Sequence, residues 1–272
     1  MRVEVSIFNT IKGLMFKIRI IRNLFVKIES YIFDIFKVFD LRRYTGKSSK
    51  DTNEHNEKLI LNFKKFYERN YSDDEIKAII KYSEKRIKSA WRGHHYFALW
   101  LVKELQPLTI VDLGVDRGFS TLIFGAQNIG KVYGIDWFKK YNFLGEGIDD
   151  YIPTMRNRRK MEKKFRITNV TIIKSKFSEV AKKWKKNIDI LHIDGAHTYK
   201  DVKEDYQTWR KFLNENSVIL FHDTNVYEGV IRFFGELDLP KYNFTHSYGL
   251  GVVSKNKELI SKIKEIWDIR PQ

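Results

Sequence analysis

The chain has 272 residues, of which 43% are hydrophobic and 15% aromatic, enough for one large folded domain or a domain with an extension, and wholesale disorder is excluded. It contains no cysteine, which excludes a disulfide framework, a thiolate zinc site and a cysteine nucleophile, and which fits a reducing, cytoplasmic location. The formal net charge is +16, a value that invites a nucleic-acid or membrane partner.

The positive charge is concentrated in two segments. Residues 1–50 carry eleven Lys or Arg against four acids, and residues 156–186 carry thirteen against two. The rest of the chain is close to neutral. This distribution indicates either two local basic surfaces or solvated helix faces in a lysine-rich chain, and both interpretations stay open here.

Residues 1–45 are predicted to form an amphipathic helical extension. Within residues 5–40, apolar side chains recur at alternating spacings of three and four, at Ile11, Leu14, Ile18, Ile21, Phe25, Ile28, Ile32, Ile35 and Phe39. Charges interrupt every apolar run before it reaches bilayer-spanning length, and Glu4 and the lack of a small-residue cleavage site argue against a signal peptide. Such a helix could pack on its own domain, pair with a second copy in a homodimer, lie on a membrane surface as a peripheral contact, or form a loosely held arm.

Residues 46–95 are predicted to form a linker and a helical cap. The polar composition of 45–58 favours a linker, and helices are expected at 60–70, 72–91 and 94–105. Ser72 and Glu75 have the spacing of a capping box at the start of the second helix.

Short apolar strands alternate with helical segments in the second half of the chain. Strands are expected at 108–114, 131–138, 170–175, 188–195 and 217–224, and helices at 120–127, 155–166, 178–184 and 199–213. This alternation predicts an α/β fold with a parallel sheet and helices on both faces. Ligands of such sheets bind at the carboxyl ends of the strands.

Two strand ends carry residues suited to a nucleoside cofactor. Gly114 and Gly118, in VDLGVDRGFS (111–120), permit close backbone approach at a strand-to-helix turn. Asp136 ends the second strand, where a carboxylate can accept hydrogen bonds from both ribose hydroxyls, and the neighbouring Trp137 can cover an adenine ring. The alternatives are glycines that serve packing alone and an Asp136 that caps the next helix.

The segments VDLGVDRGFST, YGIDWF, DILHIDGAHTYKDVKEDYQTW, SVILFHDTN and HSYGLGVV together resemble class I S-adenosylmethionine-dependent methyltransferases. The closest subgroup comprises the small O-methyltransferases of glycan and natural-product sugar pathways, and the resemblance covers about residues 95–255. It implies a Rossmann-like, mostly parallel seven-stranded sheet with helices on both faces, in a methyltransferase domain over 96–272 that follows the N-terminal helical extension.

The resemblance implies a role in cofactor binding for seven residues. Asp112, Gly114 and Gly118 would shape the pocket for the methionine part of S-adenosylmethionine, and Ser120 would lie near its carboxylate. Asp136 would hold the ribose, Trp137 would flank the adenine, and Ser175 would lie near the adenine edge. The chain departs from the family beside Ser175, because relatives often carry an acid there and this sequence has Lys174 and Lys176.

A divalent metal site is expected at the ends of the fourth and fifth strands. Adjacent parallel strands lie about 4.8 Å apart, so Asp194 and Asp223 can converge on one ion. The resemblance implies Mg²⁺ there, and His222, in place of a further acid, could shift the preference toward Mn²⁺ or another metal. The alternative is that the two carboxylates order loops or bind substrate hydroxyls.

His197, three residues after Asp194, is the candidate general base. A sugar hydroxyl attacks a sulfonium methyl poorly unless its proton is removed, and an imidazole with an ordinary pKa of about 6.5 can accept that proton. His192 lies inside its strand and is expected to be structural, and no role is assigned to His94 and His95.

The expected function is O-methyl transfer from S-adenosylmethionine to a hydroxyl of a sugar, nucleotide-sugar or glycan, with Asp194 and His197 catalytic. A phenol or another natural product is the alternative acceptor. A further alternative is a non-catalytic cofactor-binding scaffold that acts through its N-terminal helix. Nucleic acid is disfavoured as a substrate, because no DPPY-like segment follows the fourth strand and cysteine is absent.

Overall fold

The computed structural model describes residues 49–71, 73–141, 147–148 and 150–268. The chain divides into two compact units, Met1–Asn53 and Glu54–Gln272. The predicted helical extension of residues 1–45 lies outside the described residues. The following description concerns the Glu54–Gln272 unit.

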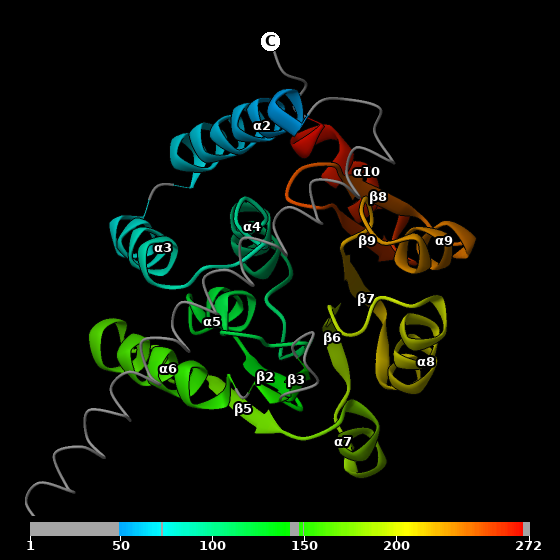
Figure 1. Ribbon diagram of the computed structural model, residues 1–272. Coiled ribbons are helices and arrows are strands. Elements are labelled where there is room, and N and C mark those ends of the chain that lie inside the picture. Colours follow the sequence, from blue (N-terminus) through cyan, green and yellow to red (C-terminus); the bar gives the residue numbers. More distant parts are fainter. Residues whose placement is uncertain (1–48, 72, 142–146, 149, 269–272) are drawn as a thin grey trace, which may run out of the picture. The chain divides into compact units, whose positions relative to one another are not determined.

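A seven-stranded sheet forms the centre of this unit (Figure 1). Its strands are β1 (Thr109–Leu113), β2 (Lys131–Asp136), β5 (Val170–Lys174), β6 (Ile188–Ile193), β7 (Leu213–His222), β8 (Lys241–Phe244) and β9 (Leu250–Ser254). Their order is β5-β2-β1-β6-β7-β9-β8. Strand β9 pairs antiparallel with both β7 and β8, so it alone runs opposite to the other six strands of this sheet. The predicted Rossmann-like, mostly parallel seven-stranded sheet is therefore confirmed. The short strands β3 (Lys140–Tyr141) and β4 (Gly147–Ile148) pair separately after β2.

Helices cover both faces of the sheet, as predicted (Figure 1). One face carries α2 (Ser49–Asn70), α3 (Asp74–Arg86), α4 (His95–Leu105), α5 (Phe119–Gly125), α6 (Tyr151–Phe165) and α10 (Lys257–Trp267). The other carries α7 (Phe177–Lys183), α8 (Tyr199–Trp209) with its 3₁₀ continuation Arg210–Phe212, and α9 (Glu228–Glu236). Neighbouring residues of β1 divide between these two cores, Ile110 to the first and Val111 to the second, because successive side chains of a strand point to opposite faces.

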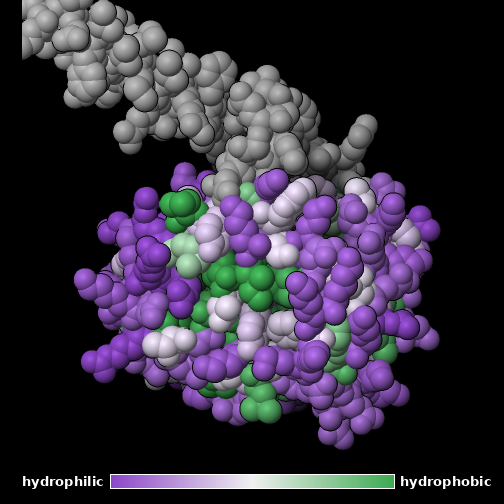
Figure 2. Space-filling view, turned by 90° about the horizontal axis from the view of Figure 1, so that it is seen from below, coloured by the Kyte–Doolittle hydropathy of each residue, from purple (hydrophilic) through white to green (hydrophobic). Residues whose placement is uncertain are grey.

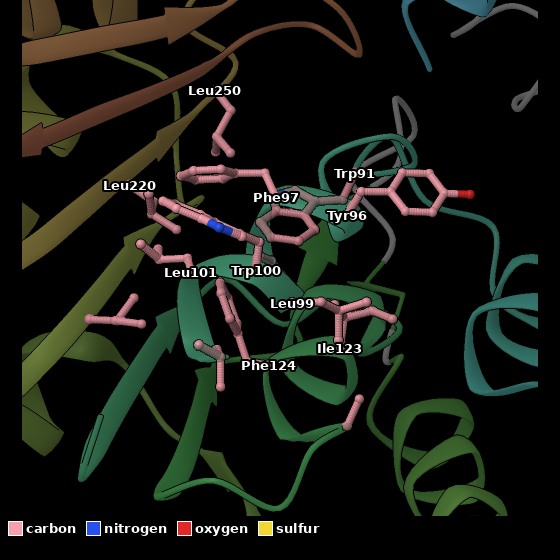
Figure 3. Packing of buried hydrophobic residues seen from close by; sticks show 14 of the residues in the cluster. Trp91, Tyr96, Phe97, Leu99, Trp100, Leu101, Ile123, Phe124, Leu220 and Leu250 are labelled. Atoms are coloured by element: carbon pink, nitrogen blue, oxygen red, sulfur yellow. The ribbon is translucent and has the colours of Figure 1, made fainter. Parts of the chain in front are cut away.

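The core beside α4 is strongly aromatic, as Figure 3 shows. Every residue of α4 from His95 to Val102 is buried, which explains why this segment is apolar around its whole circumference. The ring of Phe97 packs on Phe244 of β8 at a centroid distance of 4.6 Å and on Trp267 of α10 at 5.6 Å. Phe63 of α2 also contacts Trp267, at 5.6 Å. The predicted cap helices therefore belong to the same core as the sheet.

Two local predictions about the cap need correction. Helix α2 begins at Ser49, within the expected linker 45–58, and its apolar Leu59 and Phe63 are buried in the core. Helix α3 has Asp73 as its N-cap, whose carboxylate accepts hydrogen bonds from the amides of Glu75 and Ile76. Aspartate supplies the acceptor that the predicted capping box assigned to Ser72, which lies outside the described residues.

In the described part of the chain, no helix combines the length and the apolar character that crossing a bilayer requires.

Candidate functional site

The site lies at the carboxyl edge of the sheet, where β6 and β7 end side by side. Asp194 follows β6 directly, and its amide donates a hydrogen bond to the carbonyl of Leu113 at the end of β1 (2.8 Å). Asp223 follows β7 and has a left-handed backbone (φ 64°), held by a hydrogen bond from its amide to the carbonyl of Gly249 (3.0 Å). The fold therefore brings both carboxylates to one place, as the sequence predicted.

His197 completes this cluster from the turn before α8. Its Nε2 lies 2.9 Å from Asp223 Oδ2 and 4.0 Å from Asp194 Oδ1. The phenol ring of Tyr227, just before α9, stacks on the imidazole with a centroid distance of 4.0 Å and an interplanar angle of 12°. Two carboxylates and one aromatic face therefore fix the orientation of the ring.

The carboxylates also determine the protonation of His197. Burial alone would lower its pKa, but the hydrogen bonds and negative charges of Asp194 and Asp223 outweigh burial and raise the pKa to about 9. Without a bound ligand, His197 is therefore an imidazolium at neutral pH. It must lose a proton before it can act as a base.

His222 lies beneath the two carboxylates, away from solvent. Its Nδ1 is 3.4 Å from Asp194 Oδ1 and 3.2 Å from Asp223 Oδ1, and its side chain is 2% exposed. Burial lowers the pKa of His222, but the adjacent charges of Asp223 and Asp194 prevail and raise it to about 10. The imidazolium in turn outweighs burial of the acids and lowers the pKa of Asp223 to about 2 and that of Asp194 well below its ordinary value. His222 is therefore a buried counter-cation for this acid pair.

The donor set fits a divalent cation in a form that differs from the sequence prediction. Among the described residues, the group whose ligand atoms all lie within 4.8 Å of one another is Asp194, His197 and Asp223. His197 takes the place that we expected for His222. The buried Asp223 Oδ1 atom accepts no hydrogen bond in the described part of the chain, and its charge is balanced by His222 Nδ1 at 3.2 Å, so a bound cation would compete with this imidazolium for the oxygen.

The glycine loop after β1 adjoins this cluster. Gly114 has φ 101°, and a Cβ atom there would lie 1.9 Å from the carbonyl oxygen of Asp194. Gly118 also has a left-handed backbone (φ 88°) and precedes α5 as its N-cap. The sequence indicated close backbone approach at these glycines, and the structure shows that at Gly114 the approaching group is the turn after β6.

Asp112 and Ser120 make their contacts inside the protein. The Asp112 carboxylate is fully buried and accepts hydrogen bonds from Ser120 Oγ (2.8 Å) and Thr121 Oγ1 (2.5 Å). Its other oxygen lies 2.6 Å from His192 Nδ1, and His192 Nε2 accepts a hydrogen bond from the indole of Trp91 (3.1 Å). Because an indole nitrogen can only donate, His192 carries its proton on Nδ1 and donates it to Asp112. These hydrogen bonds therefore hold the start of α5 against β1 and β6.

Asp136, Trp137 and Ser175 lie together at the ends of β2 and β5, across β1 from the acid pair. Asp136 Oδ2 accepts hydrogen bonds from the amides of Val115 and Asp116 (3.0 Å each), and Oδ1 accepts one from Phe138 (2.6 Å). The sequence offered ribose binding or helix capping for Asp136, and neither interpretation included these hydrogen bonds to the glycine loop. Trp137 is 38% exposed, and the amide of Ser175 donates to the Asp136 carbonyl (2.9 Å).

Comparison with known proteins agrees with this arrangement. The family model described as a methyltransferase domain (Methyltransf_24) matches residues 111–224, from β1 to the acid after β7. Residues 111–224 are therefore similar in sequence to methyltransferase domains. The match includes Asp112, Gly114, Asp136, Asp194, His197 and Asp223.

Two solved structures share the fold of this chain. A candidate caffeoyl-CoA O-methyltransferase from Staphylococcus aureus superposes with a TM-score of 0.53 at 14% identity, covering 72% of this chain and 100% of that one. CalS11, a calicheamicin methyltransferase, superposes with a TM-score of 0.53 at 12% identity, covering 79% and 96% of the two chains.

A curated relative is more similar in sequence. The protein y4gI of Sinorhizobium fredii, named as uncharacterized, is 34% identical over 184 residues, which make up 63% of this chain and 20% of that protein. The chain therefore spans about a fifth of the length of this relative.

Proposed function

We propose that this chain transfers a methyl group from S-adenosylmethionine to a hydroxyl of a sugar, nucleotide-sugar or glycan. The observation that carries the proposal is the cluster of Asp194, His197 and Asp223 at the carboxyl edge of a methyltransferase sheet, beside the glycine loop. A sugar hydroxyl is weakly acidic, so its methylation requires a group that takes the proton. This cluster supplies such a group.

The cofactor would lie along the ends of β1, β2 and β5. The proposed contacts are the loop from Gly114 to Ser120 for the methionine part, Asp136 for the ribose, and Trp137 with Ser175 for the adenine. When bound, S-adenosylmethionine supplies a methyl group activated on a sulfonium. The loop follows β1 at the carboxyl edge of the sheet, where ligands of such sheets bind, and this position supports the assignment.

His197 is the proposed proton acceptor. In its neutral form, the imidazole of His197 would accept the proton that the acceptor hydroxyl loses as its oxygen takes the methyl group from the sulfonium, which would leave as the neutral thioether. Asp223 then stabilises the resulting imidazolium at 2.9 Å, and the stacked Tyr227 keeps the ring in its plane.

A divalent cation would be held by Asp194 and Asp223. When bound, such an ion supplies Lewis acidity that lowers the pKa of a hydroxyl. His197 offers one nitrogen toward this pair, so it serves either as the base or as a third ligand. We propose the base, and loss of metal affinity in a His197→Ala variant would instead assign it to the metal.

A phenolic or other natural-product acceptor is the second candidate. The two structural neighbours, a candidate caffeoyl-CoA O-methyltransferase and a calicheamicin methyltransferase, agree with such an acceptor. A phenol is more acidic than a sugar hydroxyl, so it makes a smaller demand on His197.

Methyl transfer from labelled S-adenosylmethionine distinguishes these candidates. The purified chain is incubated with sugars, nucleotide-sugars and glycans, with phenols in parallel, and calorimetric titration of the cofactor is run first. Label in the carbohydrate pool supports the proposal, label in phenols alone supports the second candidate, and no cofactor binding at millimolar concentration contradicts both. Repeating the assay in chelator and after return of Mg²⁺ or Mn²⁺ tests the metal, and full activity in chelator would remove it.

A further inference from the structure

One face of α6 carries a continuous stripe of cations. Its members are exposed and follow helical spacings of three and one residues, at Arg156, Arg159, Lys160, Lys163 and Lys164. The opposite face is buried through Thr154, Met161 and Phe165. The stripe is therefore fixed toward solvent by the packing of the helix.

These cations are not neutralised within the described part of the chain. None of the five forms an ion pair with a described carboxylate, and the acid on this helix, Glu162, pairs with Arg158 (3.5 Å). Like charges three and four residues apart on a helix repel each other, and no acid in the first turn offsets the repulsion. The stripe thus weakens α6 in isolation, and a negatively charged partner would remove that cost.

The charged surface continues onto α3. Helices α3 and α6 pack together through Tyr82 and Phe165, whose rings are 5.4 Å apart, and Lys164 Nζ lies 4.6 Å from the centroid of the Tyr82 ring. The second half of α3 adds the exposed cations Lys81, Lys85 and Arg86 beside the stripe. Two adjacent helices therefore present one basic surface, here called the α3–α6 basic face.

An exposed apolar side chain accompanies this basic face at the start of α6. Ile152, in the first turn of α6, is 65% exposed. The lower edge of the ribbon in Figure 1, where β5, α6 and α7 lie, faces the viewer in Figure 2. Figure 2 shows a hydrophobic area bordered by hydrophilic residues on this side of the molecule. Exposed apolar side chains beside cations are typical of contact with lipid headgroups.

We propose that the α3–α6 basic face docks this domain on an anionic lipid surface. Each Lys or Arg near such a surface contributes about 1 kcal/mol, which is roughly a fivefold gain in partition. The exposed Ile152 adds insertion between headgroups, which a purely electrostatic nucleic-acid contact would not use. The proposal is independent of the methyl acceptor, because it concerns binding rather than turnover.

Vesicle sedimentation of the full chain tests the proposal. Phosphatidylcholine vesicles with and without about one third phosphatidylglycerol are compared, since anionic lipid carries the attraction. The test variant is Arg159→Gln/Lys160→Gln/Lys163→Gln. The control is Lys255→Gln/Lys257→Gln/Lys264→Gln, which removes the same charge from exposed positions at and beside α10. Both variants retain residues 1–48, so a difference between them reports on α6, and circular dichroism confirms that both are folded.

The expected result is binding that requires phosphatidylglycerol, a loss of about tenfold or more in the α6 variant, and a change of less than about threefold in the control. Equal losses in both variants would overturn the proposal, because net charge alone would then explain binding. Unchanged partition of the α6 variant would also overturn it. A short single-stranded DNA is run in parallel, and loss of DNA binding with vesicle binding intact would assign the face to nucleic acid instead.

Discussion

At the scale of single residues, the turn after β6 combines structural and chemical roles. Asp194 and His197 contribute side chains to the cluster, while the backbone of Asp194 occupies the space that a side chain at position 114 would need. Glycine at 114 thus permits the acid pair to lie beside the glycine loop. Substitution can separate the two roles. The chemical role depends on the ionisable side chains of Asp194 and His197, and the structural role depends on the space that the missing side chain of Gly114 leaves for the Asp194 backbone.

Replacing His197 by alanine is expected to lower turnover by roughly 10²–10⁴-fold, the usual contribution of a general base. Cofactor affinity should stay within a few-fold, because the proposed cofactor contacts lie at β1, β2 and β5. Initial rates and calorimetric titration with S-adenosylmethionine measure the two quantities. His55→Ala, an exposed histidine on α2, is the matched control. Activity retained within a few-fold in His197→Ala would exclude His197 as the base.

The two histidines also make the stability of the ligand-free chain depend on pH. His197 and His222 have a folded-state pKa of about 9 and about 10, above the unfolded value of about 6.5. Their stabilising contribution is therefore complete below about pH 6.5 and is lost as pH rises through these folded values. Most of the effect belongs to the buried His222, since the His197 side chain is 35% exposed and screened by solvent.

We expect the free energy of unfolding to fall by roughly 2 kcal/mol between pH 7 and pH 9. Urea unfolding midpoints at half-unit pH intervals measure the slope. In the His222→Gln variant, the free energy of unfolding should decrease less between pH 7 and pH 9, even if the variant is less stable than the natural chain at every pH. A midpoint that stays constant from pH 7 to pH 9 would show that neither imidazole is held charged by the acids.

Gly114→Ala tests the close approach at the end of β1. A Cβ atom 1.9 Å from the Asp194 carbonyl oxygen, at φ 101°, forces one of the two turns to move. We expect a loss of more than about 2 kcal/mol in the free energy of unfolding. Gly235→Ala is the control, because a Cβ atom at this position in α9 meets nothing within 4 Å and should leave stability unchanged or slightly raised. Equal effects of the two substitutions would contradict the steric argument.

At the scale of elements, a buried hydrogen-bond chain joins three segments that are far apart in the sequence. It runs from Trp91, before α4, through His192 of β6 to Asp112 of β1, which holds Ser120 of α5. The cap is thus tied to the glycine loop by directional bonds as well as by apolar packing.

Trp91→Phe keeps an aromatic ring at this position but removes the N–H group. His192 Nε2 would then be a buried acceptor without its donor, and we expect a loss of about 1–3 kcal/mol in the free energy of unfolding. Trp184→Phe removes a comparable bond, from the indole to the carbonyl of Lys186, at an exposed position where water can replace it. Chemical denaturation of both variants should show the larger effect for Trp91. The reverse order would indicate that the buried bond contributes nothing.

The sequence predicted those elements whose pattern is local. The strands β1, β2, β5, β6 and β7 were predicted because short apolar runs alternate with helices, and the helix after Asp194 begins as expected at its N-cap Thr198. The strands β8 and β9 were implied only by the resemblance to a seven-stranded fold, and their positions in the sequence were not predicted. β9 enters the sheet between β7 and β8 by antiparallel pairing, and such long-range pairing leaves no local pattern.

For the site, the sequence predicted which strand ends meet but not the side-chain contacts within the turns. Asp194 and Asp223 could be brought together from the sequence because parallel strands end at the same edge. The stacking of Tyr227 on His197 and the bracing of the loop by Asp136 could not, because both depend on side-chain directions in turns. From the sequence, His222 was assigned to the metal because it precedes Asp223 in the chain. In the structure its side chain is buried beneath the two acids instead.

At the scale of the whole molecule, positive charge is concentrated on one edge of the sheet. Helix α6 and the segment through α7 carry most of the excess of Lys and Arg in the folded unit, whereas α8 and α9 at the other side each carry more acids than bases. The composition showed the excess, and the structure shows that much of it faces solvent on one edge. A membrane or another anionic surface would therefore meet this edge first.

The folded unit includes the cap. Residues before the expected methyltransferase boundary at 96 supply buried apolar side chains to the core, namely Leu59, Phe63, Tyr67, Ile76, Ile79, Ile80, Ile87 and Trp91. Loss of one such side chain typically costs about 2–4 kcal/mol, and a whole domain is stable by about 5–15 kcal/mol. A chain of residues 96–272 should therefore not fold, whereas residues 49–272 should unfold cooperatively and bind S-adenosylmethionine within a few-fold of the full chain. Thermal unfolding followed by circular dichroism and calorimetric titration measure both properties. A sharp unfolding transition in 96–272 would show that the sheet and α4 make a sufficient core without the cap.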